Sequence, residues 1–238
     1  CRAFIFNFFP FTKIFRSILG SLSEHSTKSG SGLAALLTGS WINRHGVFNN
    51  ELRPISPDVS SIFQQINKQV PNAKLASIVN WAPINTDFFA RDMGLLEQPA
   101  IVDFEAHGME DDSVVAATVE LISTAEPDFT FLQLDDVDAV GHKYGFSKEY
   151  DNALIRADSQ VQSILNAIEQ HVIQTPDEDW LVVIATDHGR ESSGYSHGGQ
   201  SLSERRTFIA VNKELEYHVE PVPAVSVASL ILDHFSAS

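Results

Sequence analysis

The stretch WLVVIATDHGRESSGYSHGGQS, residues 180–201, places a short apolar run directly before a polar segment. The apolar part has the β-branched and aromatic composition of a strand that is buried on both faces. The polar part holds Asp187, His188 and His197 in a run rich in glycine and serine. Such a cluster at the end of a strand is either a functional site or a surface loop, depending on what else in the chain can meet it.

Strands and helices alternate along the rest of the chain. Four short apolar runs predict strands at 75–81, 129–134, 180–186 and 207–212. The clearest helical pattern covers 147–172, where apolar residues recur at three- and four-residue steps and Ser147 is the predicted N-cap. Shorter helical patterns occupy 58–70, 111–124 and 222–235. This alternation predicts an α/β fold with a doubly wound, mostly parallel sheet flanked by helices.

Composition narrows the classes of protein. A chain of 238 residues with 43% hydrophobic content fits one α/β domain. Its 31 acidic and 16 basic residues give a formal net charge of −15, which disfavours binding to a nucleic acid duplex or an anionic membrane surface. No transmembrane span is expected. The single cysteine, Cys1, excludes an intrachain disulfide and a thiolate metal cage, so any metal must be bound by histidine and carboxylate.

Residues 1–25 form an atypical N-terminal segment that is rich in phenylalanine and interrupted by Pro10, Lys13 and Arg16. Three interpretations stay open: the remnant of a signal sequence, a lipid-modified cysteine terminus, or a first helix whose preceding strand is missing. An extracytoplasmic or secreted location is favoured, although one cysteine leaves the redox compartment open.

Five side chains of metal-binding types follow two of the predicted strands: Asp138, His142, Asp187, His188 and His197. Ligands collect at the carboxyl ends of strands in open α/β sheets, so these side chains are expected at one edge. Gly141 is expected to bend the backbone so that Asp138 and His142 converge. Taken singly, each is more simply a turn, cap or loop residue. Together they suit zinc, with manganese or another divalent ion as alternatives, and two such ions can support displacement at phosphorus.

A nucleophile for such a site is available in residues 26–40. The run GLAALLTG, residues 32–39, predicts a short helix, and Ser29 and Ser31 lie just before its positive N-terminal end. Backbone N–H groups and the helix dipole there favour both a bound phosphate and an ionising hydroxyl. A plain N-cap role for Ser29 or Ser31 is the simpler alternative.

Four motifs in this order, SGSGLAALLTGSWINRHGVFNN, DAVGHKYG, TDHG and HGG, resemble the type I phosphodiesterase and nucleotide pyrophosphatase branch of the alkaline phosphatase superfamily. The likeness runs from about residue 26 to 212. It implies that Asp138, His142 and His197 hold one zinc ion. It also implies that Asp187 and His188 hold a second ion, together with the nucleophile and an aspartate of the first strand.

The resemblance further implies an alkaline phosphatase-like fold, with 26–238 as the catalytic domain and a small substrate-facing insertion within about 51–128. It places the nucleophile at Ser29, with Thr27 as the alternative, and it places Asn50 on a nonbridging phosphate oxygen. The earliest aspartate of the chain is Asp58, so the first-strand aspartate has no counterpart and the first strand itself is expected to be missing. A formylglycine sulfatase is disfavoured, because Gly30 and Ser31 follow Ser29 where Pro and Arg are required.

The predicted function is metal-dependent hydrolysis of small-molecule phosphate esters. Phosphodiesters or nucleotide pyrophosphate bonds would be cleaved through a seryl-phosphate intermediate at a two-metal site. One alternative is a catalytically impaired or truncated pseudoenzyme or binding protein of the same fold. Another is a phosphomonoesterase or phosphomutase of the superfamily.

Overall fold

The computed structural model describes residues 13–18, 26–96, 98–101, 110–214 and 221–237. Its strands are β1 (Lys13–Ile18), β2 (Leu75–Val79), β3 (Gln98–Ile101), β4 (Phe129–Gln133), β5 (Val183–Ala185), β6 (Arg206–Val211) and β7 (Val222–Pro223). Its α-helices are α1 (Ser29–Thr38), α2 (Ile42–His45), α3 (Ile62–Gln69), α4 (Glu110–Thr124), α5 (Asp136–Tyr144), α6 (Lys148–Gln174), α7 (Leu202–Arg205) and α8 (Ser226–Ala237). Two further helical turns are η1 (Ile84–Phe88) and η2 (Ala90–Leu95).

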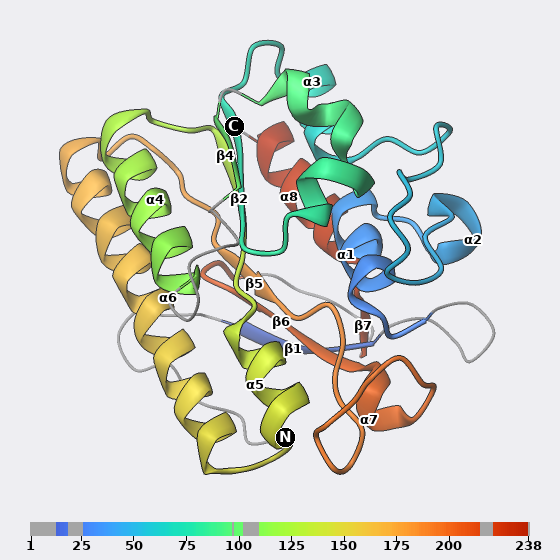
Figure 1. Ribbon diagram of the computed structural model, residues 1–238. Coiled ribbons are helices and arrows are strands. Elements are labelled where there is room, and N and C mark those ends of the chain that lie inside the picture. Colours follow the sequence, from blue (N-terminus) through green and yellow to red (C-terminus); the bar gives the residue numbers. More distant parts are fainter. Residues whose placement is uncertain (1–12, 19–25, 97, 102–109, 215–220, 238) are drawn as a thin grey trace.

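The described strands form two sheets (Figure 1). One has the order β3-β2-β4 and is parallel throughout. The other has the order β5-β6-β1-β7, and β6 runs antiparallel to both β5 and β1. The prediction of a single, mostly parallel sheet is therefore wrong for the second sheet. The chain returns from β5 to its neighbour β6 through a loop and the four-residue α7, with no long helix packed across the sheet, and the two strands pair antiparallel.

Strand β1 lies between β6 and β7 in the four-stranded sheet. The interpretation of the N-terminal segment as a helix is therefore wrong for Lys13–Ile18, and a strand does precede α1. This strand has the sequence KIFRSI, which contains no acidic residue. The signal-remnant and lipid-modified interpretations fall on residues outside the described part of the chain.

Helices cover both faces of the parallel sheet (Figure 1). Leu75 and Val79 of β2 pack into a core with α1, α3 and α8, whereas Ala76 and Ile78 pack against α4. On that second side α4 and α6 lie next to each other. Successive residues of β2 therefore point to opposite faces of the sheet, and both faces are buried. The continuous apolar sequence of this strand predicts such burial on both faces. Strands β2 and β4 confirm the predictions at 75–81 and 129–134.

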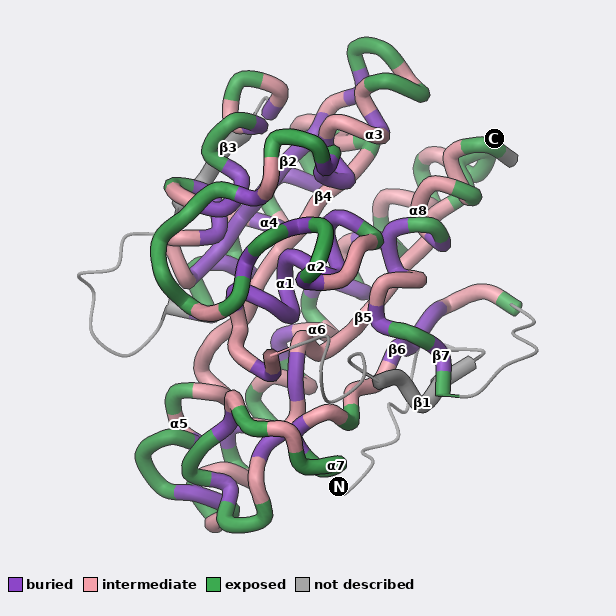
Figure 2. Tube along the Cα trace, turned by 90° about the vertical axis from the view of Figure 1, so that its right-hand side faces the viewer, coloured by how far each residue is buried: buried purple, intermediate pink, exposed green. Residues whose placement is uncertain are grey.

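Two helices are relevant to the site. Every residue of α1 from Gly30 to Thr38 is buried, so its N-terminal residue Ser29 is held on a rigid element (Figure 2). The predicted cap of α6 is confirmed, since the Ser147 side chain accepts a hydrogen bond from the Tyr150 N–H at 3.3 Å. Among the described residues, no helix has the length and apolarity that a bilayer span requires.

Candidate metal centre

Asp138 and His142 lie four residues apart on α5, so they share one face of this helix. His142 Nε2 is 3.2 Å from Asp138 Oδ2. The expectation that Gly141 bends the backbone is wrong, because the segment is a regular α-helix. Helical spacing alone brings the two side chains together.

The start of α5 is anchored by Asp111, a buried residue of α4. Its carboxylate accepts hydrogen bonds from the backbone N–H groups of Asp135 and Asp136 at 2.8 and 3.0 Å, and from Asn80 Nδ2 at 2.9 Å. The N-cap residue Asp135 makes no side-chain cap of its own. Asp111 therefore supplies from another helix the acceptor that the first turn of α5 needs. Sequence reasoning missed this role because the residues are 24 positions apart.

Asp187 and His188 follow the end of β5 and meet helix α1. A Cβ atom on Gly32 of α1 would overlap the Asp187 carbonyl oxygen, so the helix rests directly on this backbone. The same approach places Ser29 beside His188, with 3.2 Å between Oγ and Nε2. The glycines of the SGSG run thus bring the helix N-terminus to the strand end.

The three candidate hydroxyls have different surroundings. Ser31 is fully buried and donates to the Val47 carbonyl at 2.9 Å. The Thr27 hydroxyl donates to the Gly199 carbonyl at 2.8 Å. The N-cap of α1 is Lys28, so the alternative of a plain N-cap role for Ser29 or Ser31 is wrong. The Ser29 hydroxyl faces His188. Among the three, the geometry favours Ser29 as the nucleophile.

Asn50 lies beside the first turn of α1. Its Oδ1 accepts a hydrogen bond from the Gly30 N–H at 2.9 Å. Because Oδ1 is the acceptor, the Nδ2 group is the donor that Asn50 offers to an anion near Ser29. The side chain is exposed, as a substrate contact requires.

Each of the three histidines is oriented by a backbone carbonyl at Nδ1. The pairs are His142 with Tyr195 at 2.8 Å, His188 with Gly189 at 2.9 Å, and His197 with Thr27 at 2.7 Å. A carbonyl can only accept, so Nδ1 carries the hydrogen and Nε2 of the neutral ring carries a lone pair. This is the arrangement in which a second contact prepares histidine as a metal ligand.

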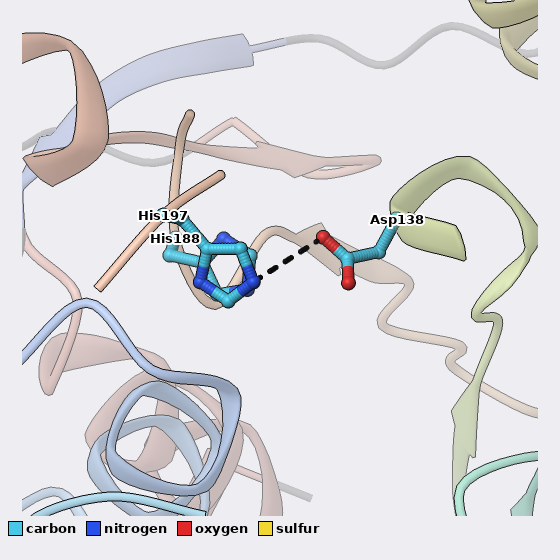
Figure 3. Close-up of side chains that lie close together, drawn as sticks. All are labelled: Asp138, His188 and His197. Atoms are coloured by element: carbon cyan, nitrogen blue, oxygen red, sulfur yellow. Dashed lines mark ion pairs between the residues drawn. The ribbon is translucent and has the colours of Figure 1, made fainter. Parts of the chain in front are cut away.

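Asp138, His188 and His197 form a compact cluster whose ligand atoms all lie within 4.8 Å of one another (Figure 3). The rings of His188 and His197 stack, with centroids 3.6 Å apart, and the Asp138 carboxylate faces them. His142 Nε2 is 3.0 Å from His197 Nε2. Two lone pairs at that distance repel unless a proton or a metal ion lies between them. The donor set therefore fits a bound cation.

The carboxylates in and beside the cluster have shifted pKa values. Burial alone would raise the pKa of Asp138, but the hydrogen bond with His197 and nearby positive charges outweigh burial and hold this pKa below its ordinary value. Burial raises the pKa of Asp187. Burial and the negative charge of Asp138 raise the pKa of Asp135 to about 6. The Asp138 carboxylate is thus stabilised by Arg190 and by the neighbouring histidines.

The structure groups the five ligand candidates differently from the two sets that the resemblance implies. His188 joins Asp138 and His197, and Asp187 Oδ2 lies 3.4 Å from His188 Nε2. Elsewhere in the described ranges, no second group of three such side chains occurs.

Fold and site together define an α/β protein in which a serine at a helix N-terminus faces a cluster of aspartate and histidine side chains. A family model for type I phosphodiesterase / nucleotide pyrophosphatase matches residues 22–204, and the chain belongs to this family. The resemblance seen in the motifs is thereby confirmed. No curated protein matches the chain.

Solved structures share the alkaline phosphatase-like fold at low sequence identity. Murine ectonucleotide pyrophosphatase / phosphodiesterase 5 matches with a TM-score of 0.66 and 11% identity over 92% of this chain and 87% of that chain. Alkaline phosphatase from the Antarctic bacterium TAB5 matches with a TM-score of 0.56 and 13% identity over 97% of this chain and 91% of that chain. Ps i-CgsB matches with a TM-score of 0.57 and 14% identity. The match covers 93% of this chain and 65% of the longer Ps i-CgsB chain. These likenesses establish the fold.

Proposed function

We propose that this protein is a metal-dependent hydrolase of small phosphodiesters that forms a seryl-phosphate on Ser29. The observation that carries the proposal is the position of Ser29 Oγ, at the N-terminus of α1 and 3.2 Å from His188 Nε2 in the aspartate and histidine cluster. Family membership supports phosphate esters as the substrate class. The preference for diesters over monoesters rests on the family alone.

The residues of the chain divide the reaction between them. Ser29 Oγ forms the bond to phosphorus while the bond from phosphorus to the leaving oxygen breaks. In the metal-free protein the Ser29 hydroxyl faces His188 Nε2, because the Gly189 carbonyl holds the ring hydrogen at Nδ1. With His188 as a metal ligand, the Ser29 proton would pass to solvent water. Asn50 Nδ2 and the backbone N–H groups at the start of α1 stabilise charge on the nonbridging oxygens. Water then hydrolyses the seryl-phosphate.

Two divalent ions, zinc before manganese, are the proposed cofactors. Asp138, His142 and His197 would hold one ion, and Asp187 and His188 would hold the other. Bound ions supply Lewis-acid stabilisation to the attacking and leaving oxygens. Nitrogen and carboxylate ligands without thiolates support zinc. The C-terminal periplasmic domain of EcEptC from Escherichia coli, solved in complex with Zn, shares the fold with a TM-score of 0.58 and 12% identity over 92% of this chain and 71% of that chain.

A nucleotide or another small phosphodiester is the proposed substrate. An inactive variant of murine ectonucleotide pyrophosphatase / phosphodiesterase 5 was solved in complex with AMP. Phosphonoacetate hydrolase from Sinorhizobium meliloti 1021 was solved in complex with phosphonoacetate. The net charge of −15 opposes binding of a nucleic acid duplex and leaves a small anion, attracted by bound cations, as the better fit.

A catalytically impaired member of the family is the second candidate. Strand β1 carries no acidic residue, so it supplies no carboxylate to the second ion. Among the described residues, the motifs then identify only Asp187 and His188 as ligands of this ion. Such a protein would bind one ion and a phosphate ester without turning it over.

Metal analysis combined with one serine variant tests the proposal. Zinc per chain is measured, and hydrolysis of bis(4-nitrophenyl) phosphate is assayed for wild type, Ser29→Ala and the control Ser31→Ala. Loss of the nucleophile is expected to lower the rate by about 1,000-fold or more, whereas Ser31→Ala retains most of the activity. One ion per chain without hydrolysis supports the impaired candidate. Less than one ion per chain, with equal activity in Ser29→Ala, ends the hydrolase proposal.

A further inference from the structure

Arg190 lies two residues after His188 and has no part in the reaction described above. Among the arginines and lysines whose burial the structure describes, it is the only buried one. Arginine side chains are rarely buried, and a buried guanidinium requires partners for its five N–H donors. The partners of Arg190 therefore indicate its role.

The guanidinium contacts a candidate ligand and the loop that orients another. Nη1 forms an ion pair with Asp138 Oδ1. Nε donates to the Gly194 carbonyl at 2.6 Å, and Nη2 lies 3.4 Å from the Tyr195 carbonyl. The same Tyr195 carbonyl accepts the Nδ1 hydrogen of His142. One side chain thus holds Asp138 directly and shares the carbonyl that orients His142.

Gly141 makes room for this guanidinium on α5. A Cβ atom at Gly141 would lie 2.6 Å from Arg190 Cζ and 2.7 Å from Nε, distances that real Cβ atoms do not show. The guanidinium therefore lies against the backbone of the helix turn between Asp138 and His142. This contact explains why glycine stands between the two ligands in the DAVGH motif, where no bend is present.

The contact with Asp138 leaves that residue able to bind a cation. Arg190 engages Oδ1, while Oδ2 faces His142 Nε2 at 3.2 Å. Oδ1 also lies 3.6 Å from His197 Nε2, so a carboxylate held by Arg190 keeps both oxygens directed toward histidines, at little further cost in side-chain entropy. The positive charge of Arg190 also offsets the mutual repulsion of the half-buried carboxylates.

We propose that Arg190 is a positioning residue of the metal centre: it aligns Asp138 and His142 before a metal ion binds. The inference rests on the proposed function in that the cluster must bind a divalent metal ion. Lysine cannot do the same, because a single ammonium group lacks the planar fork that reaches a carboxylate and two carbonyls together.

Zinc affinity of the metal-free protein tests this role without any activity assay. Zinc binding is measured by competition with a chelator for wild type, Arg190→Lys and the control Arg91→Lys. Arg91 is an exposed arginine away from the cluster that also donates to two backbone carbonyls, those of Ile55 and Ser56, at 3.0 and 3.2 Å. Arg190→Lys is expected to weaken zinc binding about 10- to 100-fold, and Arg91→Lys is expected to leave it within about twofold.

Gly141→Ala gives a second route that keeps the arginine. Alanine favours the helix more than glycine does, so helix formation is not impaired, but its Cβ displaces the guanidinium. Zinc affinity is expected to fall about tenfold. Thermal unfolding of each metal-free variant shows whether it is folded, and long-range ¹H–¹⁵N spectra show whether His142 keeps its hydrogen on Nδ1.

Wild-type zinc affinity in folded Arg190→Lys and Gly141→Ala proteins overturns the positioning role, even if the wild type hydrolyses phosphodiesters. Zinc binding that depends on Arg190 in a protein without hydrolytic activity supports the positioning role and ends the proposed function. A wild-type protein that binds no zinc overturns both.

Discussion

Asp135, one residue before α5, shows how closely charge is balanced at the site. Burial and the Asp138 charge raise its pKa from 3.8 to about 6. The folded protein therefore retains a proton that the unfolded chain releases as the pH rises above 3.8. The resulting loss of stability is absent at acidic pH, grows between the two pKa values, and is complete above about pH 6.

Asp135→Asn removes this charge while it retains the oxygen that accepts from Gln133 Nε2 at 3.0 Å. We expect the metal-free variant to gain about 2 kcal/mol of unfolding free energy at pH 7.5, and almost nothing at pH 4. Urea unfolding at both pH values measures the difference. Asp177→Asn, at an exposed position, is the control for loss of a surface charge. An equal gain at both pH values would contradict this account.

Residue types at the site could be predicted from the sequence, but their partners could not. Asp138, His142, Asp187, His188 and His197 were identifiable because they follow strand ends. Asp111 and Arg190 were not, because their roles depend on contacts between elements that are remote in sequence or on burial. An aspartate in a helical pattern and an arginine after a histidine carry no local signal of such contacts.

Helix α1 reaches the site because it has no side chain where it meets Asp187. Alanine at Gly32 would favour the helix by about 1 kcal/mol, but its Cβ would overlap the Asp187 carbonyl oxygen. We expect Gly32→Ala to lose about 2 kcal/mol of stability net and to lower hydrolysis at least tenfold, since Ser29 moves away from His188.

Urea unfolding and the diester assay measure these two effects. Gly94→Ala is the matched control, because a Cβ there meets no atom within 4 Å. A Gly32→Ala protein with wild-type stability and activity would show that the close approach of α1 is not required.

The sequence predicted that several helices and strands exist, but it did not predict the directions in which the strands run. The apolar runs at 75–81 and 129–134 form β2 and β4, and the periodic pattern after Ser147 forms α6. The directions of β1 and β6 depend on chain connections, which apolar runs do not encode. The helical state of α5 depends on the cap from Asp111, which is also non-local.

For the molecule as a whole, a bound metal is expected to contribute much of the stability. Ligand present at 1,000 times its Kd adds about 4 kcal/mol, which corresponds to about 10 °C in Tm for a chain of this size. EDTA is therefore expected to lower the Tm of the zinc-loaded wild type by about 10 °C and to have little effect on Asp138→Ala. Differential scanning fluorimetry measures both, and equal shifts in the two proteins would argue against binding at this cluster.

The family was predictable at this scale because the order of four motifs is a property of the entire chain. Each motif alone has simpler interpretations, but their order matches one family, and the family model covers residues 22–204. The number of bound metal ions could not be predicted from the sequence. It depends on whether Asp187 and His188 can hold a second ion without a carboxylate from strand β1, which has no acidic residue.

Trapping the intermediate tests the central claim most directly. Zinc-loaded protein is mixed with excess diester, quenched in acid during turnover, digested and mapped by mass spectrometry. A phosphoester is expected on the peptide that contains Ser29, located on that serine by fragmentation and absent from Ser29→Ala. Turnover with no modified Ser29, or with the modification at Thr27 or Ser31, would contradict it.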